Sequence, residues 1–358
     1  MFTETLARRV LRSPLIDLLT GPHGVDRYTE LVAPTWTQGD ARAKVIAVRR
    51  QTPRSVTLIL EPNQACSGFL AGFRAGQHIN LTVEIDGRRR TRPYSPASAE
   101  GADHIELTIG RHDGGLVSNH LYKHARPGMV VGLDSVGGQF VLPTVRPSRI
   151  LFVSGGSGIT PVMSMLRTMR VEGSDREVAF IHYARSAQEA CYRDELAAMH
   201  GVKVLHGFTR SGDTADLDGH FCAAHLAAAM PDPGEDTAVF VCGPPALVAA
   251  VREHCASVRS ESFVPPTFGV SAETSGGRIA FTDSGVEIAD DGRPLLVQAE
   301  AAGLTPESGC RMGICHSCTR RKTRGAVRNM ITGSVSTTEE EDVQICVSAP
   351  VGDVELAL

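Results

Sequence analysis

Four cysteines near the C-terminal end constrain this chain more than any other feature of its sequence. Cys310, Cys315 and Cys318 follow C-x4-C-x2-C spacing, and Cys346 comes after a gap of 27 residues. This is the ligand spacing of a [2Fe–2S] cluster, because iron and sulfide take soft thiolate ligands. A four-cysteine zinc site is the alternative, although zinc sites usually pair one C-x2-C motif with another. We therefore expect a tight loop and a more distant segment to enclose the cluster.

The loop that carries the first three cysteines consists mainly of small or polar residues. Gly309 and Gly313 let backbone N–H groups approach the sulfides closely, and such donors set the potential of the cluster. Basic residues stand beside this loop and predict a face that would attract an acidic partner protein. They are Arg311, Arg320, Arg321, Lys322 and Arg324. The alternative is a solvated charged surface without a partner.

Length and composition narrow the class of protein. The chain has 358 residues, enough for two or three domains. Its net charge of −4 gives no general attraction to nucleic acid. No run of about 18 apolar residues occurs, so no transmembrane segment is expected. The five cysteines outside the motif lack the spacing of a disulfide framework, which indicates a reducing cytoplasm.

Residues 1–40 form a leader that does not read as a secretory signal, because Arg12, Pro14 and Asp17 interrupt its apolar run. Its leucines could still line one face of an amphipathic surface, with arginines opposite. Such a helix would either pack on the body of the protein or dock to a membrane, peripherally at the inner face.

The pattern then changes three times along the chain. Residues 41–146 contain short alternating strands separated by turns, which is typical of a small antiparallel barrel. Residues 147–263 alternate strands with helices, which indicates a parallel sheet with crossover connections. A proline-containing linker at 264–270 leads to strands, a helix and the cysteine loop within 271–358. The sequence therefore predicts a multidomain protein of α/β and β classes.

The barrel region contains the motif Arg-Pro-Tyr-Ser at residues 92–95. At a bound flavin, Arg92 can pair with a pyrophosphate and Tyr94 can lie against the isoalloxazine ring. Ser95 can hydrogen-bond near N5, the atom that receives hydride. A loop tyrosine that simply packs is the alternative. The flavin contacts expected here are Arg92, Pro93, Tyr94, Ser95, Ile109 and Arg111.

A glycine-rich turn at Gly114-Gly115 leads into a predicted helix. Backbone N–H groups and the helix dipole hold phosphate at the start of such a helix. The contacts expected from this turn are Gly115, Leu116, Val117 and Ser118. Turn and motif together favour a flavin site.

A second glycine-rich turn, Ser154 to Pro161, lies between a buried strand and a helix. Its glycines allow close backbone approach to the pyrophosphate of a nicotinamide nucleotide, and Pro161 suits the first helical turn. The strand ending in Cys242-Gly243-Pro244 would place its thiol beside the nicotinamide, although an ordinary buried thiol is the alternative. The nucleotide contacts expected here are Gly156, Ser157, Gly158, Thr160, Pro161, Cys242, Gly243 and Pro244.

The residues after the second strand of this region favour NADPH over NADH. The strand ends in Ala184-Arg185-Ser186, without an acidic residue to hold a ribose 2′-hydroxyl. Arg185 and Ser186 could take a 2′-phosphate instead, with Arg193 helping from the next helix.

These motifs, in this order, resemble those of the ferredoxin–NADP⁺ reductase superfamily. The matching subgroup carries a C-terminal plant-type ferredoxin and includes reductase components of bacterial oxygenases and fatty-acid desaturases. The resemblance covers about residues 41–358. It implies an antiparallel barrel that binds FAD, with FMN in a minority, then a nucleotide-binding parallel α/β domain and a β-grasp ferredoxin domain. It also implies catalytic roles for Ser95 and Cys242 and a phenylalanine near the flavin, which Phe263 matches.

The number of electrons that each cofactor transfers at a time explains why one chain would carry three of them. A nicotinamide gives two electrons as hydride, a [2Fe–2S] cluster takes one electron at a time, and a flavin can do both. The predicted function is a reductase that passes electrons from NAD(P)H through FAD and the cluster to a protein acceptor, a desaturase or an oxygenase component. The alternatives are a diaphorase-like reductase without a dedicated protein partner and a redox sensor.

Overall fold

The computed structural model describes residues 35–37, 39–234, 236–266, 268 and 276–358. Two compact units divide the chain: the first holds the residues up to Arg89 and Tyr94–Ser262, and the second holds Arg90–Pro93 and Phe263–Leu358. The predicted leader surface, at residues 1–34, lies outside the described residues, and so does part of the predicted linker.

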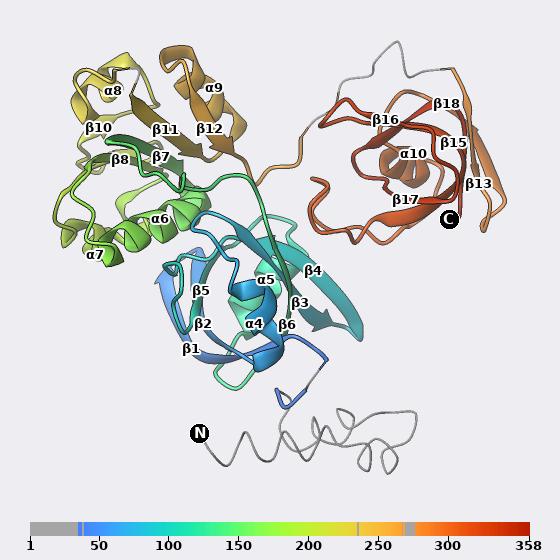
Figure 1. The fold of residues 1–358 in the computed structure, drawn as a ribbon, viewed down its shortest axis with the longest axis horizontal. Helices are drawn as coiled ribbons and strands as arrows, with labels where there is room; N and C mark the ends of the chain where they lie inside the picture. The colour runs from blue at the N-terminus through green and yellow to red at the C-terminus, as the bar shows by residue number, and fades with distance from the viewer. Residues whose placement is uncertain (1–34, 38, 235, 267, 269–275) are drawn as a thin grey trace. The chain divides into compact units, whose positions relative to one another are not determined.

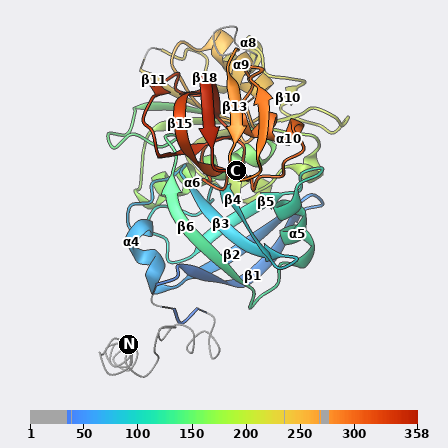
Figure 2. The same cartoon turned by 90° about the vertical axis from the view of Figure 1, so that its right-hand side faces the viewer.

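The first unit begins with the predicted antiparallel barrel, a six-stranded sheet in the order β4-β3-β6-β1-β2-β5 (Figure 2). The strands are β1 (Arg42–Thr52), β2 (Ser55–Pro62), β3 (His78–Ile85), β4 (Arg88–Tyr94), β5 (Ile105–Gly110) and β6 (Val130–Gly137). Val45, Leu58, Leu81 and Leu107 are completely buried and belong to one apolar cluster inside the barrel. Burial of these alternating apolar residues holds the barrel together.

Short segments connect the strands of the barrel. Asp86 and Gly87 join β3 to β4 with φ values of 52° and 71°. Positive φ at both central residues is the requirement of a tight hairpin turn, and the Asp-Gly pair meets it at low steric cost. The helical segments of the barrel are η2 (Gln64–Cys66), α4 (Ser67–Leu70) and α5 (Leu116–His124).

The same unit continues with the predicted parallel sheet, in the order β10-β9-β8-β7-β11-β12. Its strands are β7 (Arg149–Gly155), β8 (Glu177–Ala184), β9 (Val202–Phe208), β10 (Leu217–Asp218), β11 (Thr237–Cys242) and β12 (Val258–Glu261). Its helical segments are η3 (Gly156–Gly158), α6 (Ile159–Val171), η4 (Ala187–Glu189), α7 (Arg193–Ala197), α8 (Ala223–Ala229) and α9 (Pro245–His254). Helix α6 covers one face of the sheet, and α8 and α9 cover the other (Figure 1).

The strand order reverses between β7 and β11. From β7 the chain proceeds to β8, β9 and β10 on one side, whereas β11 and β12 lie on the other. The loops that follow β7 and β11 therefore diverge, and ligands of open α/β sheets bind where this happens. Both predicted nucleotide motifs follow these two strands.

The second unit contains a mixed sheet, β14-β13-β18-β15-β16, with β17 paired to β15. Its elements are β13 (Arg278–Phe281), β14 (Val286–Ala289), α10 (Leu295–Ala301), β15 (Thr319–Asn329), β16 (Val335–Ser336), β17 (Glu341–Gln344) and β18 (Ser348–Leu356). Strands β13 and β18 are parallel, and β15 runs antiparallel beside β18 (Figure 2). Leu295, Leu296 and Ala299 of α10 pack on Phe281 and Leu356 of the sheet. This arrangement confirms the predicted β-grasp fold.

Candidate functional site

The glycine turn after β7 packs directly against the end of β11. A Cβ atom added to Gly158 would lie 2.1 Å from the carbonyl oxygen of Cys242, and one added to Gly155 would lie 2.9 Å from Cδ of Pro244. Only glycine, which has no Cβ atom, allows the backbone of the turn to come this close to the end of β11. The fold thus brings the two predicted nucleotide motifs together at the reversal of strand order.

Helix α6 begins at this turn and is suited to an anion. Its first turn contains no acidic residue, and Pro161 lies within it. The positive end of the helix dipole favours a phosphate there. Thr160 donates its hydroxyl to the carbonyl oxygen of Ser157 at 3.2 Å, so this side chain closes the turn. Gly156 has a φ of 55°, which glycine adopts without strain.

Cys242 is completely buried at the end of β11. Burial, and then the nearby Glu261 carboxyl, hold the pKa of this thiol well above its ordinary value. Cys242 is therefore a neutral thiol and not a thiolate nucleophile. Its Sγ lies 4.0 Å from Oε2 of Glu261 on the neighbouring strand. Burial raises the pKa of Glu261 to about 8, so this carboxyl group holds a proton at neutral pH.

Glu261 belongs to a row of polar side chains across five strands that no local sequence motif predicts. Glu261, Cys242, Ser154, His182 and His206 occupy paired positions on β12, β11, β7, β8 and β9. The Ser154 hydroxyl is 2.7 Å from Nδ1 of His182. Only pairing between strands reveals the row, because no two of these residues are neighbours in the sequence.

Ser95 carries a buried hydroxyl that suits a bound flavin. The residue is 4% exposed, and its Oγ has no hydrogen-bond partner among the described residues. A buried polar atom without a partner is costly unless a ligand supplies one. Tyr94 packs at the edge of the barrel cluster. Arg92 donates Nη1 to the carbonyl oxygen of Thr91 at 2.8 Å.

The start of helix α5 meets the requirements of a phosphate site. Gly115 is its N-cap, and the first turn contains no acidic residue. A Cβ on Gly115 would lie 2.5 Å from Oγ of Ser118. Any residue other than glycine at position 115 would therefore clash with this hydroxyl. Ile109 and Val117 are each 1% exposed and pack in the barrel core, and Ile109 pairs with Val56 of β2.

Arg111 is held in place beside this helix. Its Nε donates to Oδ1 of Asn119 at 3.3 Å, and its guanidinium lies 5.0 Å from the centre of the Tyr122 ring. Leu116, which follows Gly115, is 47% exposed. Pro93, Arg92 and the half-buried Phe263 belong to the second unit.

The predicted 2′-phosphate residues lie in one segment, together with two acidic residues. Arg185 Nη1 lies 3.9 Å from Oε2 of Glu189, and Arg193 Nη1 donates to the carbonyl oxygen of Ala187 at 3.4 Å. Asp213 accepts the N–H of Ala187 at 3.0 Å. Ser186 is the N-cap of the short helix η4 between the arginines.

The four predicted cluster ligands are buried and form two pairs of sulfurs. The thiol of Cys310 donates a hydrogen bond to Cys315, and the thiol of Cys346 donates one to Cys318. The bond from Cys310 is the main cause of a lowered pKa at Cys315. No three His, Cys, Asp or Glu residues in the described part of the chain are arranged to hold a single metal ion. Four cysteine sulfurs gathered in two pairs are the ligand set of a two-iron cluster.

The backbone of the cysteine loop surrounds these sulfurs. The N–H of Cys310 donates to Sγ of Cys315 at 3.1 Å, and that of Met312 donates to Sγ of Cys310 at 3.3 Å. A Cβ on Gly309 would lie 2.4 Å from Sγ of Cys315, and Gly313 has a φ of 73°. Such N–H donors stabilise the negative charge of a bound cluster.

The structure retains only part of the predicted basic face beside the cluster, because Arg311, Arg321 and Arg324 are exposed and Lys322 is not. Lys322 is completely buried, and its Nζ lies 3.2 Å from Oε1 of Glu341. Arg311 forms two hydrogen bonds with Glu300, and Arg321 lies beside both Glu340 and Asp342. Those contacts are 3.0 and 2.6 Å for Arg311 and 3.2 and 3.5 Å for Arg321. Carboxylates therefore neutralise most of the basic residues from which this face was predicted.

Comparison with known proteins assigns the three parts of the chain. Residues 67–141 match the oxidoreductase FAD-binding domain, residues 152–253 the oxidoreductase NAD-binding domain, and residues 279–351 the 2Fe-2S iron-sulfur cluster binding domain. An NADPH oxidoreductase of Mycobacterium tuberculosis is 34% identical over 347 residues, which are 94% of this chain and 90% of that protein.

Two further similarities cover nearly the whole chain. The reductase subunit of glycine betaine monooxygenase from Pseudomonas aeruginosa is 28% identical over 89% of this chain and 96% of its own length. The solved structure of phthalate dioxygenase reductase superposes with a TM-score of 0.57 and 25% identity, over 89% of this chain and 98% of that one. The protein is an NAD(P)H-dependent oxidoreductase that binds FAD, a pyridine nucleotide and a [2Fe–2S] cluster. Within the described residues, no helix combines the length and apolar character needed to cross a membrane.

Proposed function

We propose an electron path for this chain, which belongs to the ferredoxin–NADP⁺ reductase superfamily and to its branch with a C-terminal [2Fe–2S] ferredoxin domain. Electrons enter from NADPH, pass through FAD and the cluster, and leave to a separate protein, an oxygenase component. The proposed cofactor-binding domains span residues 41–146, 147–263 and 271–358, joined by the linker at 264–270. A fatty-acid desaturase is the second candidate acceptor.

The juxtaposition of Gly158 with Cys242 carries this proposal, because it brings the two nucleotide motifs together in the unit that also holds Ser95 of the flavin motif. The bound flavin supplies the change from two-electron to one-electron transfer. Ser95 offers its unpaired hydroxyl to the flavin, and neutral Cys242 shapes an uncharged surface for the nicotinamide. Glu261 holds a proton beside that thiol. The paired thiolates of the second unit hold the cluster.

The names of two relatives support a protein acceptor. One is the reductase subunit of a monooxygenase, and the other is the reductase of a dioxygenase. A Cys315→Ala variant tests the path, because it removes a cluster ligand and leaves the first unit intact. It should still reduce ferricyanide with NADPH, and it should lose the reduction of cytochrome c and of the oxygenase component. Turnover of the partner without a cluster would place the exit at the flavin and refute this path.

NADPH is the proposed donor, through Arg185, Ser186 and Arg193. Each guanidinium would exchange its present neighbours, Glu189 or the carbonyl oxygen of Ala187, for the 2′-phosphate. The name of the mycobacterial relative supports this choice. Replacing both arginines by alanine should raise KM for NADPH far more than KM for NADH. Equal kcat/KM for the two nucleotides in the unmodified protein would contradict the preference.

The cysteines also bear on location. None of the nine forms a disulfide within the described part of the chain, and five of them lie outside the cluster motif. Free thiols persist in a reducing compartment, so we place the protein in the cytoplasm.

A further inference from the structure

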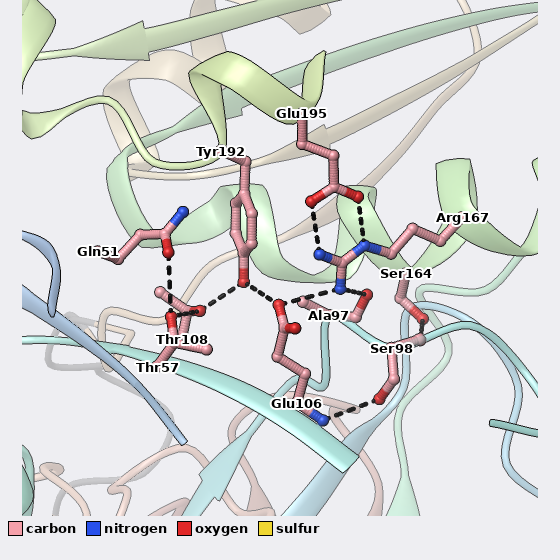
Figure 3. A network of polar contacts seen from close by, with 10 residues as sticks. All are labelled: Gln51, Thr57, Ala97, Ser98, Glu106, Thr108, Ser164, Arg167, Tyr192 and Glu195. Carbon is pink, nitrogen blue, oxygen red and sulfur yellow. Dashed lines mark hydrogen bonds and ion pairs between the residues drawn. The ribbon is translucent and has the colours of Figure 1, made fainter. Parts of the chain in front are cut away.

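A network of buried polar contacts joins the barrel to the parallel-sheet domain within the first unit (Figure 3). At its centre is Arg167 of α6. Its Nε and Nη2 donate to the two carboxylate oxygens of Glu195 on α7, both at 2.7 Å. Its Nη1 donates to Glu106 of β5 at 3.0 Å and to the carbonyl oxygen of Ala97 at 2.8 Å. One guanidinium therefore links two helices of one domain to two segments of the other.

Tyr192 forms a second link in the network. Its hydroxyl donates to Oε1 of Glu106 at 2.9 Å and shares a further hydrogen bond with Thr108. Thr108 continues to the hydroxyl of Thr57 at 2.6 Å, inside the barrel. Tyr192 is 6% exposed, and its φ is 61°. A bulky residue in the left-handed region is uncommon and marks a position that its surroundings enforce.

The network connects the segments that meet the two cofactors. Residues 97–100 follow Ser95 and are attached along α6: Ser164 donates to the carbonyl oxygen of Ser98 at 2.6 Å, and Thr168 accepts the N–H of Glu100 at 3.0 Å. Helix α6 itself starts at the nucleotide turn. Tyr192 immediately precedes Arg193, one of the proposed 2′-phosphate residues. The network would thus fix the position of both ends of the bound nucleotide relative to the barrel.

We propose that Arg167 and Tyr192 are positioning residues that fix the nucleotide domain on the flavin barrel and so set the approach of nicotinamide to flavin. Transfer of hydride requires the reacting atoms within about 3–3.5 Å, and a misplacement of about 1 Å can lower the rate about a hundredfold. Neither side chain touches a cofactor in this account. The inference rests on the proposed function only for its first step, reduction of flavin by NADPH.

Tyr192→Phe is the sharper test, because it removes one hydroxyl and keeps the ring. The control is Tyr183→Phe, which removes a buried hydroxyl bonded at 2.6 Å to His225 within the nucleotide domain alone. Arg167→Lys keeps the charge but cannot form the paired hydrogen bonds of a guanidinium group. Its control is Arg170→Lys, on the exposed side of the same helix. All four variants are studied as full-length protein loaded with FAD.

Two measurements are compared in these variants. Stopped-flow reduction by NADPH gives the limiting rate and its dependence on nucleotide concentration. We expect Tyr192→Phe to lower the limiting rate about five- to tenfold, the loss of one hydrogen bond, with unchanged FAD content and a larger isotope effect from deuterated NADPH. Arg167→Lys should lower it further. Hydrogen–deuterium exchange, which needs no turnover, should become faster in residues 97–100 and in α7, and the controls should match the unmodified protein.

Wild-type limiting rates in both Tyr192→Phe and Arg167→Lys would overturn the proposal, whatever the exchange data show. Slower reduction with unchanged exchange in residues 97–100 and α7 would also overturn it, since the fixed arrangement would then be intact. A failure of the proposed function is distinct: the unmodified protein itself would not reduce its flavin with NADPH, and the exchange measurement would still decide whether the network holds the two domains together.

Discussion

At the scale of single residues, Glu261 shows how burial changes a carboxyl group. Its pKa rises from 4.5 to about 8 because its environment excludes water. Below pH 4.5 both the folded and the unfolded chain hold this proton. In that range the group does not change the free energy of unfolding with pH. As the pH rises toward 8, the unfolded chain releases the proton while the folded chain keeps it, so the folded state loses stability.

We therefore predict that Glu261→Gln removes part of the pH dependence of unfolding. Between pH 5 and pH 9 the free energy of unfolding of the unmodified protein should fall relative to that of the variant, by an amount on the order of 3 kcal/mol. Denaturant unfolding of both proteins at several pH values measures the difference. Parallel pH profiles for the two proteins would show that the carboxyl group is ionised or exposed.

At the scale of elements, the contact between the turn before α6 and the end of β11 leaves no space for a methyl group. Gly158→Ala should push the two apart, because its Cβ would meet the Cys242 carbonyl at 2.1 Å. We predict a loss of stability of about 1–3 kcal/mol and a weaker affinity for NADPH. Thermal unfolding and nucleotide titration measure these effects. Gly212→Ala is the matched control, since no atom lies within 4 Å of its added Cβ.

Strand pairing at the same scale explains why the predicted basic face is partly neutralised. Strand β17 lies antiparallel to β15 and sets Arg320 opposite Val343, Arg321 opposite Asp342 and Lys322 opposite Glu341. Oppositely charged residues on paired strands stabilise each other. Between residues 276 and 358 the chain has twelve acidic and eight basic residues, so this unit carries no positive excess.

At the scale of the whole molecule, separate domains for flavin and cluster predict that the cluster can be removed without loss of the flavin. Cys346→Ala should lose the iron and labile sulfide, about two of each per chain, and keep stoichiometric FAD. Iron, sulfide and flavin analysis of the purified protein measures this. Cys222→Ala, an exposed cysteine in the first unit, should retain all three. Loss of flavin from the Cys346 variant would show that the units fold together.

The sequence determined the features that depend on neighbours along the chain. The cysteine spacing predicted the four ligands, and the glycine turns before α5 and α6 predicted two phosphate sites, because the backbone conformation of a loop is encoded locally. Short alternating strands predicted the antiparallel barrel, and the alternation of strands with helices predicted the parallel sheet.

Only the tertiary structure decided which side chains meet across strands and domains. It placed Glu261 beside Cys242, buried Lys322 against Glu341, and joined Arg167 to Glu106 and Glu195. Such partners are far apart in the sequence, and their proximity depends on strand register and domain packing. A charge or a thiol acquires its ionisation state from that environment, so the sequence could supply the residues of the site but not their states or their partners.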